Sequence, residues 1–410
     1  MYRDTLSLLG PALPVVSFLG RLPTAMCQLG SLLLVAETSG SLATAGLAGG
    51  ALAAGQTVAG PVIGRLTDRH GQRGVVLVAS LANAVAVAAL VLAALAHVPT
   101  AWLMVLAALA GASVPQVGPL ARTRSVALAR RSGADDRLVG AVLSFEGTLD
   151  EVSFVLGPAF VGLAAALAHP AAALLLAALL LVVFGTAFAL HPTARDTAPE
   201  VSAATRSGAA ERTRLPGSAY ALRGTMVLQG AMFGASQAGI TALTEELGAP
   251  AQAGLVYAAM GVMSAAVGLS MAAVPARIGL VTRWRAATVA LVVLSVPLLF
   301  VGSLGALYAV VVVLGAAYAP HLITVFGLTE RCVPATRLAE SMAFLTSGIV
   351  AGQALALALS GRLAEGHGAP AAFAVAVGAA VACALLSWTV RVPTPMSVRE
   401  LRPAAAERSG

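Results

Sequence analysis

The sequence predicts an all-α membrane protein whose twelve transmembrane helices form two six-helix halves. Three observations predict this fold class. Hydrophobic residues make up 58% of the 410 residues and charged residues only 10%, far below the roughly 25% charged residues of soluble domains. Apolar runs of about 20 residues, the length that crosses a bilayer, follow one another with short polar gaps. These gaps are alternately rich in arginine and almost free of it.

The apolar runs, separated by Gly, Pro or Arg residues, place the helices in order. Six are expected near residues 10–36, 42–64, 74–96, 100–121, 138–167 and 171–191. Six more are expected near residues 223–246, 251–275, 286–303, 305–328, 339–364 and 370–391. The first run is long and further spans follow it at once, so we expect a retained helix and not a cleaved signal peptide.

A long polar gap divides the chain. Residues 192–222 are rich in Ala, Ser, Thr, Pro and Arg and lack apolar periodicity, which predicts a cytoplasmic linker. The expected domains are therefore residues 1–191 and 223–391, followed by a cytoplasmic tail at 392–410. Glu37 and Glu245 each stand eight residues before an Ala-Gly-Leu sequence, which favours an internal repeat of the two halves.

The basic residues predict the orientation. All 25 are Arg, and all except Arg21 and Arg362 fall on the side of both termini. The positive-inside rule then places both termini in the cytoplasm, with the protein in the cell membrane. Topology explains the net charge of +7, so no nucleic-acid partner is expected. The expected partners are the lipid bilayer, protons and a small-molecule substrate, with the chain acting as a monomer.

The gap after the second helix reads GRLTDRHGQR. It resembles the hallmark Gly-x-x-x-Asp-Arg-x-Gly-Arg-Arg of the major facilitator superfamily (MFS) of transporters. Gln72 departs from that pattern, and the matching residues are Gly64, Asp68, Arg69, Gly71 and Arg73. The resemblance implies alternating access between two halves, with this motif latching one conformation. The alternative is an ordinary basic turn that obeys the positive-inside rule.

A second motif lies in the fifth expected helix. Gly157, Pro158 and Gly162 resemble a Gly-Pro motif of exporters in this superfamily, with the last glycine displaced by one position. Pro158 would bend the helix, while Gly147, Gly157 and Gly162 would allow close helix contacts. The resemblance also implies an arginine within the fourth helix, but here Arg122 and Arg124 are expected only at its cytoplasmic end.

Three acids lie within the fifth helix without a basic neighbour. A rise of 1.5 Å per residue places Glu146 about 12 Å and Asp150 about 18 Å deep in a core about 30 Å thick, with Arg21 about 17 Å deep. Glu146 and Asp150 share a helix face, whereas Glu151 is turned about 100° from Asp150. We expect Arg21 to pair with Asp150 or Glu146, and the role of Glu151 stays open.

The internal repeat bears on the role of these charges. The corresponding positions of the second half hold Thr346, Val350 and Ala351, and Gln229 stands where the first half has Arg21, so the fold does not demand charge there. An ionised, unpaired acid at this depth is unfavourable by about 2.5–3.5 kcal/mol. Two readings remain: a buried ion pair that fixes helix register, or proton coupling. The proton-coupling candidates are Arg21, Glu146, Asp150 and Glu151.

Further polar residues are candidates for the substrate path, with hydrogen bonding between helices as the alternative. They are Gln28, Asn83, Gln116, Gln229, Gln237 and His321. The three cysteines, Cys27, Cys332 and Cys383, show neither a disulfide framework nor a zinc spacing. No metal or cofactor is expected.

The function expected from these features is a proton-coupled exporter of a small organic compound, such as a drug or secondary metabolite. One alternative is a proton symporter that takes up a polar metabolite such as a sugar or organic acid. A membrane enzyme or non-transporting receptor is the third, disfavoured because no catalytic cluster is visible within the helices. The sequence also has no phosphate-binding loop for an ATP motor.

Overall fold

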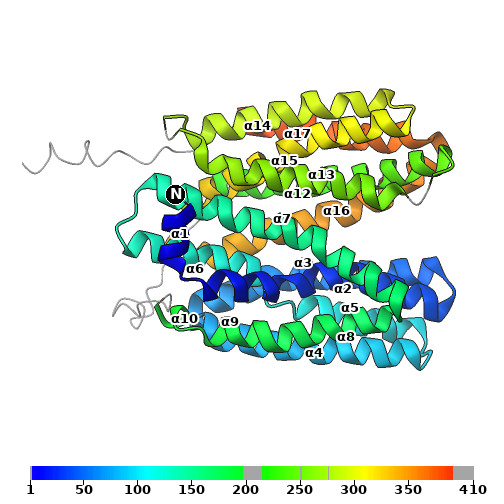
Figure 1. The fold of residues 1–410 in the computed structure, drawn as a ribbon, viewed down its shortest axis with the longest axis horizontal. Coiled ribbons are helices and arrows are strands. Elements are labelled where there is room, and N and C mark those ends of the chain that lie inside the picture. Colours follow the sequence, from blue (N-terminus) through cyan, green and yellow to red (C-terminus); the bar gives the residue numbers. More distant parts are fainter. Residues whose placement is uncertain (1, 197–214, 250–251, 276, 391–410) are drawn as a thin grey trace, which may run out of the picture.

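The protein is a bundle of long helices, shown in Figure 1 for the computed structural model. The structure describes residues 2–196, 215–249, 252–275 and 277–390. The expected tail at 392–410 and residues 197–214 of the expected linker lie outside the described residues. The first helix group comprises α1 (Tyr2–Leu9), α2 (Ala12–Ser39), α3 (Leu42–His70), α4 (Gln72–Leu95), α5 (Thr100–Ala112), α6 (Val117–Arg131), α7 (Asp136–Leu167), α8 (Pro170–Leu180), η1 (Leu181–Gly185), α9 (Thr186–Leu190) and α10 (Thr193–Asp196). The second helix group comprises α12 (Gly217–Glu246), α13 (Ala253–Ser270), η3 (Met271–Ala273), α14 (Leu280–Ser295), η4 (Val296–Phe300), α15 (Leu304–Cys332), η5 (Ala335–Arg337), α16 (Leu338–His367) and α17 (Ala369–Thr389).

Eleven described helical stretches are long and apolar enough to cross a membrane. Helix α12 is not among them, yet it runs within the bundle beside these helices (Figure 1) and buries residues on several of its faces. A span that neighbouring helices shield from lipid can carry polar side chains such as Gln229. With α12, the described helices supply the twelve expected spans.

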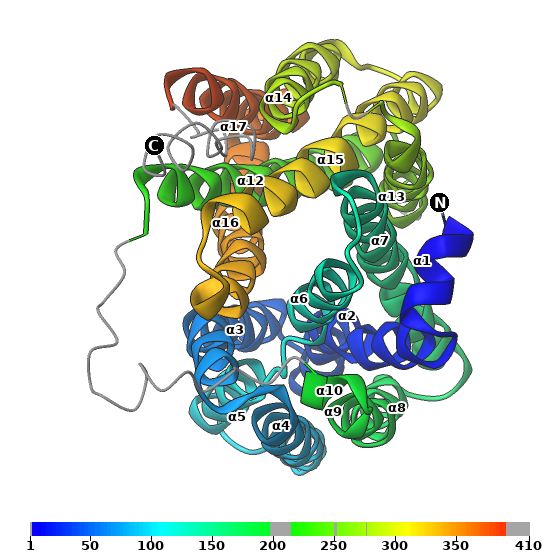
Figure 2. The ribbon, with the colours of Figure 1, turned by 90° about the vertical axis from the view of Figure 1, so that its left-hand side faces the viewer.

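The two helix groups face each other around the middle of the molecule (Figure 2). Each has its own apolar core: one is drawn from α2, α3, α4, α5, α7 and α8, the other from α12 to α15 with α17. Between the groups, α3 packs against α16 and α7 against α13. One end of the bundle, on the left in Figure 1, holds α1, the end of α6 and α10. We call it the arginine-rich end because Arg69, Arg130, Arg283 and Arg331 lie there.

The fourth span differs most from its expected range of 100–121. It is broken between α5 and α6, where Gln116 adopts a positive φ of 56°, and α6 then continues to Arg131. Pro115 helps to explain the break, because the residue before a proline is pushed out of the helical region. The longer helix carries Arg122 into the bundle, whereas hydropathy alone predicts it at a helix end.

Two helix starts also differ from expectation. A short helix, α1, precedes the first span, and Gly10 with a positive φ of 68° separates it from α2. Helix α12 begins at Gly217, within the expected linker, after Pro216 in an extended conformation. Buried Leu222 continues the apolar face of α12 toward the arginine-rich end, which explains why this helix starts before residue 223.

Candidate functional site

Arg21 of α2 bridges two acids of α7. Its Nη2 lies 2.6 Å from Glu146 Oε2, and its Nη1 lies 2.7 Å from Asp150 Oδ1. The guanidinium also donates to the carbonyl oxygen of Ser17 at 3.2 Å, and Ser125 of α6 donates to Glu146 Oε1 at 2.8 Å. Only 4% of Arg21 and 1% of Glu146 are exposed, so these charges are satisfied by each other and not by water.

Arg122 completes this cluster, which we call the charged centre (Arg21, Arg122, Glu146 and Asp150). It forms an ion pair with Asp150 Oδ2, and its guanidinium lies 3.8 Å from the ring centroid of Phe326 on α15. A cation over an aromatic face is attracted to it, so Arg122 also links the two helix groups. This corrects the expectation that the fourth span lacks a buried arginine.

Glu151 points away from the charged centre, toward the second helix group. Its carboxyl lies beside the hydroxyl of Ser264 on α13, within electrostatic reach of Tyr257 and Tyr318. Within the first helix group, the charges that act on the Glu151 carboxyl are those of Asp150 and Arg122. It is 8% exposed, and it forms no ion pair with any residue that the structure describes. Of the four acids in α7, the other three form ion pairs, and Glu151 alone has no cation holding it among the described residues.

The surroundings of Glu151 are polar but incompletely bonded. The hydroxyls of Ser264, Ser236 and Tyr318 are buried and close no hydrogen bond of full geometry within the described ranges, although Ser264 lies beside Glu151 and Ser236 beside Tyr318. Phe233 stacks on Tyr318 with 4.3 Å between ring centroids. Because buried hydroxyls are nearly always hydrogen-bonded, a water or a polar group of a substrate could complete these bonds, while only the carboxylate of Glu151 could take up a proton.

Asp68 of the sequence motif joins the two helix groups. Its Oδ1 accepts a hydrogen bond from the backbone N–H of Ala339 at 3.0 Å, and its Oδ2 accepts from that of Glu340 at 2.8 Å. These are N–H groups of the first turn of α16, which has no side-chain cap of its own. A carboxylate satisfies such groups and complements the helix dipole. A Cβ on Gly64 would meet the carbonyl oxygen of Ala339 at 2.7 Å, so this glycine allows the approach.

A second set of contacts closes the same end. Arg130 Nε lies 3.2 Å from Glu330 Oε1, and Arg331 Nη2 lies 3.1 Å from Asp136 Oδ2. Both ion pairs cross between the helix groups. The remaining motif residues do not: Arg69 and Arg73 are exposed, and Gly71 ends α3 with a φ of 80°. Among the matching motif residues, Asp68 and Gly64 therefore make the close contacts with α16.

Replacing Asp68 by Asn should loosen the arginine-rich end. Loss of the charge at the start of α16 removes about 1 kcal/mol, which predicts a roughly fivefold rise in the open-to-closed ratio at this end. Spin labels at Gly74→Cys and Thr282→Cys, in a chain without its native cysteines, report this by their distance distribution. The matched control is Asp135→Asn, because Asp135 caps α7 within one helix group. An equal shift in the control would contradict a specific latch.

Gln72, which departs from the family motif, has a defined partner. Its Oε1 accepts hydrogen bonds from Arg124 Nε at 3.0 Å and from Nη2 at 2.8 Å, and its Nε2 donates to Thr123 at 3.0 Å. Arg124 also donates to the carbonyl oxygen of Phe188 at 2.9 Å. An arginine at position 72 would offer Arg124 no acceptor, so Arg124 explains the departure.

Restoring the motif with Gln72→Arg should therefore destabilise the protein. Hydrogen bonds to a charged group contribute about 1.5–3 kcal/mol, and two buried guanidinium groups would also repel each other. We expect a clear fall in the thermal unfolding midpoint in detergent. Gln72→Glu keeps an acceptor and should retain most of the stability. A Gln72→Arg protein as stable as the unchanged chain would refute this account of the motif.

Only part of the Gly-Pro motif in the fifth span makes close contacts with other helices. A Cβ on Gly157 would meet that of Ala25 on α2 at 2.6 Å, and a Cβ on Gly147 would meet Ile323 of α15 at 2.9 Å. These two glycines do allow close packing of α7. Gly162 has open space around its Cβ position, so the expected close contact there was wrong. Pro158 lies inside α7 without ending it.

The substrate-path candidates separate into two sets. Asn83 donates to the carbonyl oxygen of Ala110 at 2.5 Å, while Gln229 and His321 bond each other at 2.6 Å deep in the second group. These three residues join helices. The half-buried Gln28 and Gln237 instead face single glutamines 3.5 Å away, and the buried amide nitrogen of Gln116 has no partner among the described residues. These three remain candidates.

Within the described ranges, no group of three or more His, Cys, Asp or Glu side chains could hold a metal ion. The chemistry available at this site is ion pairing, hydrogen bonding and proton binding.

A family model described as the Major Facilitator Superfamily matches residues 6–241 and again residues 224–409. The two matches together extend over nearly the whole chain. Among curated proteins, no relative matches it.

Several solved structures share the fold over almost their entire length. A bacterial homologue of the iron transporter ferroportin, in its outward-facing state, has a TM-score of 0.71 at 16% identity, covering 92% of this chain and 98% of its own. The human organic anion transporter TETRAN has a TM-score of 0.65 at 18% identity, covering 93% and 97%. The fucose:proton symporter of E. coli has a TM-score of 0.64 at 14% identity, covering 92% and 97%.

Proposed function

The chain belongs to the Major Facilitator Superfamily, and we propose that it exports a small organic compound in exchange for protons by alternating access. It is a multi-pass membrane transporter and not an enzyme. We further propose that it lies in the cell membrane with both termini in the cytoplasm, as the arginine distribution favours.

The observation that carries proton coupling is the difference between Glu151 and its neighbours. Glu146 and Asp150 are held by Arg21 and Arg122, so a proton would have to displace a buried cation from them. Glu151 has no such competitor and lies between the helix groups, where their relative movement changes its surroundings. A carboxyl that is shielded from water in one state and hydrated in the other can bind and release a proton in each cycle.

The closed arginine-rich end supports an outward-facing arrangement. The hydrogen bonds from the start of α16 to Asp68, together with the ion pairs of Arg130 and Arg331, join the helix groups at the end proposed to be cytoplasmic. Export is favoured by the resemblance of Gly157 and Pro158 to the exporter motif. Gly157 also lets α7 pack closely on α2. The charged centre then keeps α2, α6 and α7 in register while the groups move.

Growth of cells with and without the protein, in a panel of amphipathic toxic compounds, should identify a substrate. Everted membrane vesicles with an acidic interior then test the coupling. Adding the substrate should release protons from vesicles that contain the protein. The rate of substrate uptake should fall when the pH gradient is collapsed. Substrate uptake without proton release would contradict proton-coupled export.

A further inference from the structure

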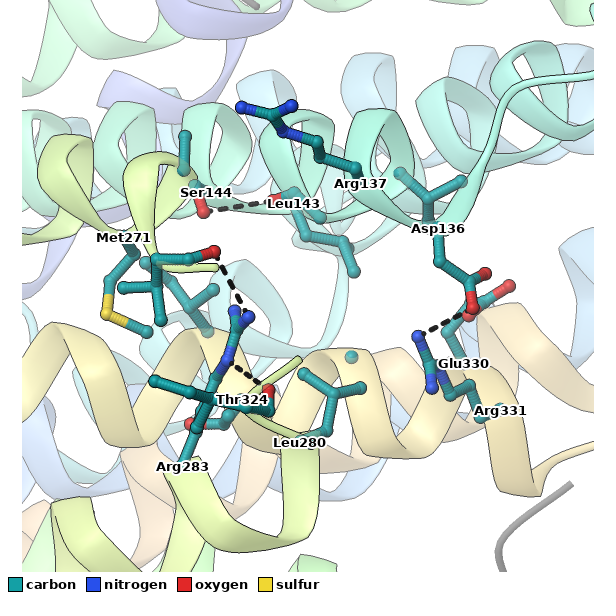
Figure 3. Close-up of a pocket in the computed structure, with 18 residues that line it drawn as sticks. Asp136, Arg137, Leu143, Ser144, Met271, Leu280, Arg283, Thr324, Glu330 and Arg331 are labelled. Carbon is teal, nitrogen blue, oxygen red and sulfur yellow. Dashed lines mark hydrogen bonds and ion pairs between the residues drawn. The ribbon is translucent and has the colours of Figure 1, made fainter. Parts of the chain in front are cut away.

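A cavity of about 170 Å³ lies between the two helix groups at the arginine-rich end (Figure 3). The start of α7 forms one wall. The connection from η3 to α14, together with the last turns of α15, forms the other. This cavity is separate from the charged centre and from Glu151, and none of the residues assigned above to substrate or proton binding lines it.

The rim of the cavity is basic. Arg331 and Glu330, which also line it, are already engaged by Asp136 and Arg130. Arg283 donates to the carbonyl oxygens of Pro275 and Ile278, both at 2.8 Å. Those acceptors are neutral, so they hold the guanidinium in place without neutralising it. Arg137, on the α7 side, forms no ion pair with the residues that the structure describes. Two arginines without an ion pair among the described residues therefore line the cavity, one from each helix group: Arg283 is held in place, whereas the exposed Arg137 turns its guanidinium away from Arg283 (Figure 3).

The walls below this rim are mostly apolar, apart from Ser144 and Thr324, whose hydroxyls donate to carbonyl oxygens of their own helices. They are formed by Val139 and Leu143 of α7, Met271 of η3, Leu280 of α14 and Ile323 of α15. A hydrophilic anion would gain nothing from these walls, whereas an amphiphile with an anionic head matches both parts. At about 170 Å³, the cavity suits a headgroup and not a whole lipid.

We propose that this cavity binds the phosphate headgroup of an anionic membrane lipid against Arg283, with the exposed side chain of Arg137 turning over the headgroup and the first part of the lipid chain along the apolar wall. Basic pockets between spans on the cytoplasmic side attract such headgroups. The two walls belong to different helix groups, so the cavity exists only while this end is closed. A ligand that binds one conformation shifts the population toward it. The lipid thus favours the closed arginine-rich end.

The test uses the full chain, labelled at Gly74→Cys and Thr282→Cys, in nanodiscs of phosphatidylcholine with or without phosphatidylglycerol. The anionic lipid should raise the closed-to-open ratio about fivefold, since closure adds the second arginine to a lipid already near the first, and one arginine contributes about that factor near an anionic surface. Native mass spectrometry should show retained phosphatidylglycerol. Arg137→Gln should lose both effects, and Arg137→Lys should keep them because the charge remains. The matched control is Arg131→Gln, an exposed arginine at the same end that does not line the cavity.

Equal losses in Arg137→Gln and Arg131→Gln would overturn the proposal, because they would show only general attraction to the membrane surface. The same closure on adding inorganic phosphate to neutral nanodiscs would overturn the lipid as the source of the anion. An unchanged closed fraction in the unmutated chain with phosphatidylglycerol would overturn it without any variant. None of these outcomes depends on transport, so they do not bear on proton-coupled export.

Discussion

Replacement of Glu151 by Gln is expected to abolish transport driven by a pH gradient, with at least a tenfold loss in proteoliposomes. Gln cannot release or take up a proton, and it retains nearly the shape and hydrogen-bonding capacity of the protonated acid. The movement of the helix groups should then persist, so substrate exchange at equal pH on both sides should stay near its normal rate. Measuring both activities separates loss of coupling from loss of folding.

The controls for this prediction come from the same chain. Glu146→Gln and Asp150→Asn remove acids of the same helix that are held in ion pairs, and Glu37→Gln removes an exposed acid. The three controls should keep a dependence on the pH gradient, although the first two should lower protein stability. If gradient-driven transport continued at the normal rate in Glu151→Gln, Glu151 would not be the coupling group.

The second large effect is expected from Arg21→Met. Removing one partner of a buried ion pair leaves an uncompensated charge and destabilises by about 3–5 kcal/mol. In this protein both Glu146 and Asp150 would lose a cation, and only Asp150 would keep another, Arg122. We expect little folded protein after detergent extraction and a markedly lower thermal unfolding midpoint.

The double variant Arg21→Met with Glu146→Gln tests the reason for that loss. Charge is then balanced again, because Arg122 and Asp150 still form a pair. Its stability should recover most of what Arg21→Met loses, which is a strong coupling between the two sites. Independent, additive losses in the double variant would mean that ion pairing is not what the charged centre contributes.

Much of the fold could be predicted from the sequence because bilayer thickness fixes the length of each apolar run. The fourth span shows the limit. Arg122 follows an apolar run directly, and hydropathy therefore places it at a helix end. Only the break at Gln116 and the continuation of α6 to Arg131 bring it to Asp150. The sequence did contain one signal: two acids share a face of α7, but only one arginine is expected at that depth. This imbalance indicates that a second cation must lie nearby.

The partners of two other residues depend on how the helix groups meet, which no local pattern encodes. Helical geometry showed that Glu151 must face away from Asp150, but not that Ser264 would lie opposite. Likewise, the motif showed that Asp68 could accept from a helix start, but not that the helix would be α16. By contrast, the pairing of Arg21 with α7 followed from depth alone, and the structure brings together Arg21, Glu146 and Asp150.

The central claim, that Glu151 carries the coupling proton, can be tested without knowing the substrate. Infrared difference spectra of the protein in lipid vesicles, recorded between acidic and alkaline pH, detect the protonated carboxyl group directly. We expect one component of the titrating carboxylic-acid absorption to be present in the unmutated chain, to persist in Glu146→Gln and Asp150→Asn, and to be missing in Glu151→Gln. A titrating band that persists unchanged in Glu151→Gln would contradict the claim.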